Sequence, residues 1–233
     1  LERGFDVVRL NLRDHGDTHY LNEGIFHSCR IAEVVGAVQR LQLLNPGRGL
    51  NLVGFSLGGN FFLRVAARAP AAGLALERVV AVCPVLDPGR TLEQLERGWA
   101  LYRRYFVWKW SRSLRKKQAA WPRLYDLREV LALDDLTGMT DVLARKYGGY
   151  PSLADYLHGY AGVGDVLAGI EARTRIIAAA DDPIIPAADL ALLARPPALE
   201  ITRTSHGGHC GFYEGRSDAT WIEREILAEL VAS

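Results

Sequence analysis

The sequence is poor in cysteine, and the few cysteines it has are far apart. Its 233 residues include only Cys29, Cys83 and Cys210. An odd number of scattered cysteines indicates neither a disulfide framework nor a zinc site. This pattern favours a reducing compartment, so we expect a cytoplasmic protein.

The sequence also lacks a strong net charge and a long apolar run. It has 28 basic and 27 acidic side chains, a net charge of +1, which predicts no nucleic-acid partner. No apolar run reaches the roughly 18 residues typical of a membrane span. No phosphate-binding loop or metal-ligand cluster is recognisable, so we expect neither a cofactor nor a metal. The hydrophobic content of 49% is enough for a sizeable core.

The chain does not start with methionine. Leu-Glu-Arg-Gly at residues 1–4 is typical of a helix end capped by glycine, and it leads directly into a predicted strand. The sequence therefore predicts that the chain begins within a domain and that the first strands are missing.

Strands alternate with helices in the first and last parts of the chain. Strands are predicted at 6–12, 50–55, 78–85, 173–180 and 198–204, and helices at 28–44, 57–69, 186–194 and 218–231, with Pro70 ending the second helix. This alternation predicts an α/β fold, a mostly parallel sheet flanked by helices. Between these first and last parts of the chain, the sequence pattern is helical and rich in aromatic residues. We therefore predict a discontinuous core over 1–87 and 173–233, with an inserted helical cap over 88–172.

One serine stands between glycines where a predicted strand meets a predicted helix. The stretch is Gly-Phe-Ser-Leu-Gly at residues 54–58. A sharp turn there would lift the hydroxyl above the sheet, and larger residues than glycine two positions before and after would collide. Ser56 is therefore a candidate nucleophile, and the N–H of Leu57 a candidate oxyanion donor. The alternative is an ordinary tight strand–helix junction.

A serine nucleophile needs a base, and histidine is the usual one near neutral pH. His206 and His209 both follow the last predicted strand in the stretch His-Gly-Gly-His. We favour His209, because the glycines let its loop aim a ring at the serine, and keep His206 as the alternative. Cys210 lacks the strand–helix turn of a nucleophile and is interpreted as a small packing residue.

The base in turn needs a carboxylate that holds its tautomer. Asp181 and Asp182 follow the predicted strand at 173–180, and Asp182 is favoured because Asp181 can instead cap the turn. Asp87 is interpreted as a turn residue before a proline. The chain order serine, aspartate, histidine is the order of α/β-hydrolases, and all three lie at carboxyl ends of predicted strands.

Together these motifs resemble the α/β-hydrolase superfamily, and more narrowly its YheT-like branch of carboxylesterases and acylglycerol lipases. The stretches that carry the resemblance are RLNLRDHG at 9–16, GFSLGGN at 54–60, GYPSLADY at 149–156, ADDP at 180–183 and HGGHCGF at 206–212. The resemblance implies that His209 is the base and Asp182 the acid. It covers only the later part of the family's domain.

The first half of the predicted cap contains a basic, aromatic helix. Residues 97–117 carry eight basic side chains and no acidic one. One apolar side includes Trp99 and Tyr102, and the other consists of Leu101, Tyr105 and Trp108. Two apolar sides are typical of a lid helix packed on both sides, with peripheral membrane contact as the alternative.

Aromatic side chains near the serine also bear on the substrate. Phe55, Trp99 and Tyr102 are candidate substrate-binding residues, and they favour an apolar acyl group. The sequence thus predicts a serine hydrolase that cleaves carboxylic esters, short-chain or acylglycerol-like, through an acyl-enzyme. A thioesterase or acyltransferase would use the same residues, and a catalytically inactive binding protein is the other alternative.

The second oxyanion donor of this fold normally follows the third strand. Only one helix is predicted between Asp14-His15-Gly16 and the strand before Ser56, so the strand at 6–12 is interpreted as the fourth. The second donor and the early strands are therefore predicted to lie outside this chain, which would make it a fragment of a hydrolase.

Overall fold

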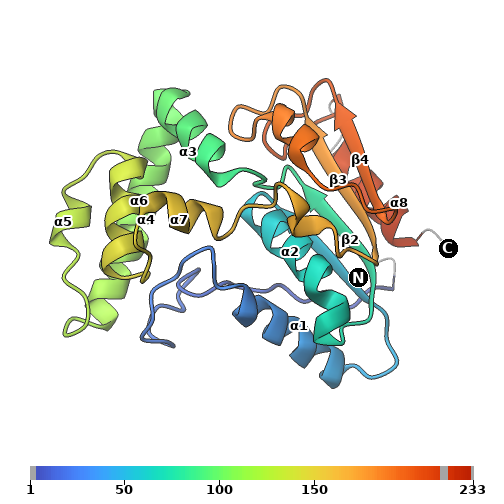
Figure 1. The fold of residues 1–233 in the computed structure, drawn as a ribbon, viewed down its shortest axis with the longest axis horizontal. Coiled ribbons are helices and arrows are strands. Elements are labelled where there is room, and N and C mark those ends of the chain that lie inside the picture. The colour runs from blue at the N-terminus through green and yellow to red at the C-terminus, as the bar shows by residue number, and fades with distance from the viewer. Residues whose placement is uncertain (1–3, 216–219, 232–233) are drawn as a thin grey trace.

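The computed structural model describes residues 4–215 and 220–231, and its centre is a four-stranded sheet in the order β1-β2-β3-β4 (Figure 1). The strands are β1 (Leu50–Phe55), β2 (Leu76–Val82), β3 (Arg173–Ala179) and β4 (Leu199–Thr204), and all neighbours are parallel. The prediction of a parallel sheet is confirmed. The predicted strand at 78–85 ends early, because Cys83 has a φ of 43° that a strand does not accommodate.

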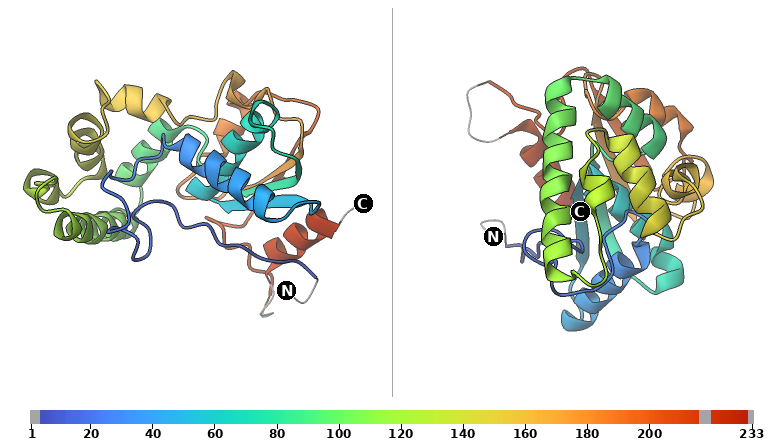
Figure 2. Two further views of the ribbon diagram at one scale, coloured as in Figure 1. Left: turned by 90° about the horizontal axis from the view of Figure 1, so that it is seen from below. Right: turned by 90° about the vertical axis from the view of Figure 1, so that its left-hand side faces the viewer.

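Helices cover both faces of this sheet, as the left view of Figure 2 shows. Helices α1 (Ile31–Leu44) and α2 (Leu57–Ala72) lie on one face, and α8 (Trp221–Val231) lies on the other. Along β2, Val79 and Ala81 belong to the cluster under α1 and α2, whereas Val80 and Val82 belong to the cluster with α8. Since side chains alternate along a strand, β2 is apolar throughout because both faces are buried.

Helix α2 continues past Pro70, so the prediction that this proline ends it was wrong. Proline lacks the N–H that would donate to the carbonyl of Ala66, but its fixed φ of about −65° is helical, so the chain can continue the helix. The helix ends instead at Gly73, whose φ of 65° is left-handed. The N–H groups of Gly73 and Leu74 donate to the carbonyls of Pro70 and Ala69, a glycine-based helix end.

The predicted strand at 6–12 is also wrong, because these residues are extended but pair with no strand of the described chain. A strand requires a hydrogen-bonding neighbour, and within the described residues β1 pairs only with β2. Leu10 and Leu12 still pack against the core, while Val7 and Val8 are 71% and 63% exposed. The alternation of apolar residues at 6–12 therefore reflects a segment that packs one side on the core but belongs to no sheet. Residues 1–3, part of the predicted helix end, lie outside the described residues.

The stretch between β2 and β3 is helical. It contains α3 (Pro88–Arg97), α4 (Ala100–Ala120), α5 (Arg128–Leu131), α6 (Leu136–Lys146), α7 (Leu153–His158) and the short 3₁₀ helix η1 (Asp165–Leu167). Helices α4 to α7 gather at one end of the molecule (Figure 1). The predicted helix at 186–194 is the 3₁₀ helix η2 (Ala187–Leu192), and residues 218–219 of the last predicted helix lie outside the described residues. The division into core and cap at residues 88 and 172 stays a prediction.

Helix α4 buries only part of one of its two apolar sides. Leu114 is buried, but Leu101, Tyr105 and Trp108 are 74%, 49% and 52% exposed. The prediction of a lid helix packed on both sides was therefore wrong, since no described element covers the second side. None of the helices in the described ranges is long and apolar enough to cross a bilayer.

A buried ion pair joins α4 to the N-terminal segment. The Lys117 ammonium lies 2.9 Å from Oδ1 of Asp14, and the two side chains are 1% and 5% exposed. Lys117 also donates to the carbonyls of Asn22 and Gly24 at 2.6 and 2.9 Å. The second oxygen of Asp14 accepts the N–H of Phe26. Both charges are thus fully hydrogen-bonded, as burial requires.

Candidate active site

Three side chains from loops at neighbouring strand ends form one chain of hydrogen bonds. Ser56 follows β1, Asp182 follows β3 and His209 follows β4. Ser56 Oγ lies 3.0 Å from His209 Nε2, and Nδ1 of the same ring lies 2.9 Å from Oδ2 of Asp182. With Nδ1 protonated, the ring donates to Asp182 and accepts from the Ser56 hydroxyl. The carboxyl ends of parallel strands are where sites gather in α/β sheets.

Ser56 occupies a strained turn. Its φ of 50° and ψ of −119° are unfavourable for a residue with a Cβ, at a cost of about 1–3 kcal/mol. The turn is held by the Ser56 N–H, which donates to the Val82 carbonyl at 2.9 Å, and by the Ser56 carbonyl, which accepts from Asn60 at 3.1 Å. As the first residue of α2, Leu57 has an N–H that the helix ladder does not use. It is thus suited to receive negative charge beside Ser56.

Glycine is required at one of the two predicted positions around Ser56, but not at the other. A Cβ on Gly54 would lie 2.5 Å from the carbonyl oxygen of Gly58 and 2.7 Å from the nitrogen of Gly59. A Cβ on Gly58 would meet nothing within 4 Å, so the prediction of a collision there was wrong. Gly59 is the second tight position, with Gly54 O and Pro84 Cβ each at 3.1 Å.

This difference predicts opposite effects of two matched substitutions. We expect Gly54→Ala to destabilise the fold by about 3 kcal/mol, because backbone atoms cannot move away from the new methyl group. We expect Gly58→Ala to stabilise it by about 0.5–1 kcal/mol, because alanine is favoured over glycine within a helix. Urea unfolding of both variants measures this, and an equal loss in both would contradict the expected geometry.

Asp182 is held in place by the turn that follows it. Its Oδ1 accepts the N–H groups of Ile184 and Ile185 at 2.8 and 3.0 Å, and its side chain is 2% exposed. These bonds leave Oδ2 aimed at His209. The two isoleucines directly follow the Asp-Asp-Pro stretch in the sequence.

The two alternatives kept open in the sequence have other contacts. Asp181 accepts the N–H of Gly208 at 2.8 Å, which lowers the pKa of Asp181 and fixes the loop before His209. His206 is 90% exposed and lies 3.5 Å from Asp181. Asp87 caps α3 by accepting the N–H groups of Gly89 and Arg90. None of these contacts involves Ser56.

The surroundings of His209 favour its protonated form. Burial lowers the pKa of His209, but hydrogen bonds to Asp182 and Cys210, together with their negative charges, outweigh burial and raise the pKa to about 9. The imidazole is therefore largely protonated at neutral pH. A base must be unprotonated before it can accept a proton, so the raised pKa would limit a role of His209 as base in neutral solution.

We therefore expect kcat/KM for an ester to rise with pH, with its midpoint near pH 9, and to level off only above that pH. Cys210→Ser should move the midpoint to lower pH, because it removes one of the groups that raise the pKa of His209. Cys29→Ser, which changes a thiol remote from this ring, should leave the midpoint unchanged. A wild-type profile already flat at neutral pH would contradict this expectation.

An apolar cluster lies beside the proposed nucleophile and acid. It consists of Val85, Ile184 and Ile185, with Leu57, Leu95, Phe106 and Tyr160 packed against them. Phe106 and Leu95 come from α4 and α3, so the helical stretch contributes to this wall. The candidate substrate-binding residues Trp99 and Tyr102 are 73% and 37% exposed and do not belong to the cluster, while Phe55 is 45% exposed. Phe106 lies on the same predicted stripe as Trp99 and Tyr102, but neither it nor Leu95 was predicted to bind substrate, because the helical pattern alone did not show which residues meet the core.

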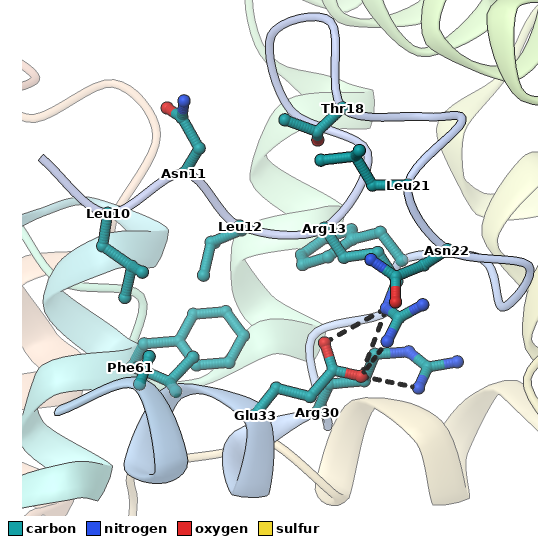
Figure 3. Close-up of a pocket in the computed structure, with 13 residues that line it drawn as sticks. Leu10, Asn11, Leu12, Arg13, Thr18, Leu21, Asn22, Arg30, Glu33 and Phe61 are labelled. Carbon is teal, nitrogen blue, oxygen red and sulfur yellow. Dashed lines mark hydrogen bonds and ion pairs between the residues drawn. The ribbon is translucent and has the colours of Figure 1, made fainter. Parts of the chain in front are cut away.

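A cavity among the described residues lies elsewhere. It has a volume of about 240 Å³ and lies between the extended N-terminal segment and α1, as Figure 3 shows. Leu10, Leu12 and Phe61 form its apolar side, and Glu33 pairs with Arg13 and Arg30 on its polar side. None of the three residues of the hydrogen-bonded chain lines it, so it contributes nothing to that site.

Among the described residues, one group has the spacing of a metal site. Ligand atoms of Cys83, His209 and Cys210 lie within 4.8 Å of one another. Two thiols and an imidazole suit a soft divalent ion such as Zn²⁺. However, both nitrogens of His209 are already hydrogen-bonded to Ser56 and Asp182, and a metal at either nitrogen would break that chain.

Comparisons with known proteins agree with this architecture. The chain is 28% identical to the putative esterase YheT of Escherichia coli, over 97% of this chain and 67% of that protein. It is 27% identical to the human monoacylglycerol lipase ABHD2, over 95% of this chain and 64% of that protein. The chain thus spans about two thirds of the length of these curated relatives. A crystal structure of a membrane phospholipase A shares the fold at 19% identity, with a TM-score of 0.50, over 94% of this chain and 68% of that one.

The match to a family model covers nearly the whole chain. Residues 1–216 match the model described as the alpha/beta hydrolase fold. The parallel sheet, the turn at Ser56 and the order of the loops after β1, β3 and β4 all suit this match. The chain therefore belongs to the α/β-hydrolase fold family.

Proposed function

We propose that this chain carries the active site of a carboxylic ester hydrolase, with Ser56 as nucleophile, His209 as base and Asp182 as acid. The observation that supports this most is the unbroken series of hydrogen bonds from Ser56 through His209 to Asp182. A serine hydroxyl is a weak nucleophile until an adjacent base accepts its proton, and this arrangement supplies that base.

In the first half of the proposed reaction, Ser56 Oγ attacks the ester carbonyl while its proton passes to His209 Nε2. Asp182 stabilises the resulting imidazolium and keeps the ring oriented. The N–H of Leu57 donates to the oxyanion that develops on the carbonyl oxygen. His209 then gives the proton to the leaving alcohol, and the acyl group remains on Ser56.

In the second half, water attacks the acyl-enzyme with His209 again as base, and the acid product leaves. The apolar cluster with Leu95, Phe106 and Ile184 favours an apolar acyl group near Ser56. The names of the relatives, an esterase and a monoacylglycerol lipase, suit esters of this kind. The acyl-enzyme, the oxyanion role of Leu57 and the preference for apolar acyl groups are all part of the proposal.

Labelling with a fluorophosphonate probe tests the proposal, because such probes react with an activated serine. We expect the wild type to be labelled, Ser56→Ala to lose the label, and Ser205→Ala, a control at an exposed serine after β4, to keep it. Hydrolysis of nitrophenyl esters of graded acyl length should follow the same pattern. A wild type that takes no label and cleaves no ester would indicate a binding protein and would contradict the proposed function.

A further inference from the structure

Two thiols face each other beside the proposed active site. Cys83 follows the end of β2, and Cys210 follows His209. Their sulfur atoms lie within 4.8 Å of each other and of a His209 nitrogen, and both thiols are free. Both residues have a left-handed φ, 43° and 67°, so the backbone is strained at each position.

Each thiol is also directed at a backbone carbonyl in the segment that contains the other cysteine. The Cys210 thiol is directed at the Val82 carbonyl at 3.8 Å, the same carbonyl that accepts the N–H of Ser56. The Cys83 thiol is directed at the carbonyl of Gly208, 3.7 Å away and next to His209. The two sulfurs therefore lie between the end of β2, whose Val82 carbonyl holds the turn of Ser56, and the loop that contains His209.

The pKa values of the two thiols are shifted in opposite directions. The hydrogen bond from Cys83 and the neighbouring His209 outweigh burial and lower the pKa of Cys210, whereas the hydrogen bond to Cys210 and burial raise the pKa of Cys83. Cys210 is half-buried and Cys83 is fully buried. An accessible thiolate next to a second thiol is the arrangement found in thiol-based redox sensors.

We propose that Cys83 and Cys210 form a redox switch. Peroxide oxidises the two thiols to a disulfide, a thiol reductant restores them, and the disulfide form has lower hydrolase activity. The effect on activity rests on the proposed function, whereas formation of the bond does not.

The chemistry needs one equivalent of hydrogen peroxide. The Cys210 thiolate attacks a peroxide oxygen, forming an S–O bond and breaking the O–O bond, and the departing hydroxide takes up a proton to become water. Cys83 loses its proton and attacks the oxidised sulfur, forming the S–S bond and releasing the oxygen as a second water. Two thiols are oxidised to one disulfide, and one peroxide is reduced to two waters.

Closure should disturb the site because a disulfide brings the sulfurs to about 2 Å. The loop of His209 and the end of β2 must then move toward each other. A displacement of about 1 Å near reacting groups can cost about 100-fold in rate. We therefore expect a loss of activity of about 10-fold to 100-fold that a reductant reverses.

Peroxide treatment of the full chain in the presence of a chelator tests the switch, since the chelator prevents a metal from occupying the same ligands. After free thiols are alkylated, peptide mapping should show the peptides of Cys83 and Cys210 joined, and dithiothreitol should restore ester hydrolysis. Cys83→Ser and Cys210→Ser, each compared with its own reduced activity, should lose the reversible part of the response. Cys29→Ser, at a thiol that instead contacts the carbonyl of Tyr156 at 3.4 Å, should respond like the wild type.

Three results would overturn the switch. The mapping could find Cys83 and Cys210 still alkylated after peroxide, the bond could form without loss of activity, or the loss could persist after dithiothreitol. If the reduced protein cleaves no ester, the proposed function fails and the regulation fails with it, while the mapping still decides whether the bond forms.

Discussion

Replacing Ser56 or His209 by alanine is expected to lower kcat by about 10⁶-fold, and replacing both should lower it no further. The two side chains share one proton-transfer event, since Ser56 Oγ lies 3.0 Å from His209 Nε2. Without the base the hydroxyl is not activated, and without the hydroxyl the base has nothing to activate. Residues that act as one unit are therefore strongly non-additive.

Asp182 should contribute less to kcat than Ser56 or His209. We expect Asp182→Asn to lower kcat by about 10⁴-fold, because an amide at this position holds the ring in the wrong tautomer. Asp181→Asn is the matched control, since Asp181 accepts the N–H of Gly208 and has no bond to His209. It should cost far less activity than Asp182→Asn.

Steady-state kinetics of the four single variants and the double variant on one nitrophenyl ester measure these effects. Circular dichroism and thermal unfolding should show that the variants remain folded, so that lost activity reports lost chemistry. Additive effects of Ser56→Ala and His209→Ala, or an Asp181→Asn defect as large as that of Asp182→Asn, would mean that the hydrogen-bonded chain is not the catalytic unit.

The sequence was informative about this site because each member follows a strand. Buried strands in a parallel sheet are recognisable as short apolar runs, and their carboxyl ends meet at one edge. Ser56 and Asp182 follow such runs, and His209 follows the more polar strand β4, so their predicted convergence required only a parallel sheet. The choice of Asp182 over Asp181 rested on the possibility that Asp181 caps the turn, whereas in the structure Asp182 accepts the N–H groups of Ile184 and Ile185 in that turn.

Several of the errors concern contacts that the local sequence pattern does not report. Whether residues 6–12 pair as a strand depends on a neighbouring strand, which the local alternation does not report. Whether Gly58 is crowded depends on the path of the backbone around it. The exposed side of α4 has the same aromatic composition as its packed side, so composition did not distinguish them.

The buried pair of Asp14 and Lys117 was missed for the same reason. Lys117 is the last of eight basic residues in 97–117, and its seven neighbours of like charge suggest a solvated helix. Only the fold shows that the Lys117 side chain is buried against Asp14 of the N-terminal segment, while the adjacent Lys116 pairs with Asp17 at the surface. Two consecutive lysines therefore have opposite environments, which makes them a matched pair for experiment.

Lys117→Met is expected to destabilise the protein by about 3–5 kcal/mol, because it leaves the Asp14 carboxylate buried without its cation. The carbonyls of Asn22 and Gly24 also lose their donor. Lys116→Met removes an ion pair whose acid, Asp17, is 90% exposed, and should have little measurable effect. Denaturant unfolding of both variants, followed by circular dichroism, measures the difference.

A double variant separates the buried charge from the lost packing. Asp14→Asn keeps the side-chain shape and suits the φ of 58° at this position, because asparagine tolerates left-handed backbone better than most residues. Combined with Lys117→Met, it removes the unpaired carboxylate, so the double variant should be more stable than Lys117→Met alone. If Lys117→Met and Lys116→Met unfold at the same denaturant concentration, Asp14 and Lys117 do not fasten α4 to the N-terminal segment. If the double variant is no more stable than Lys117→Met, the loss comes from packing and not from a stranded charge.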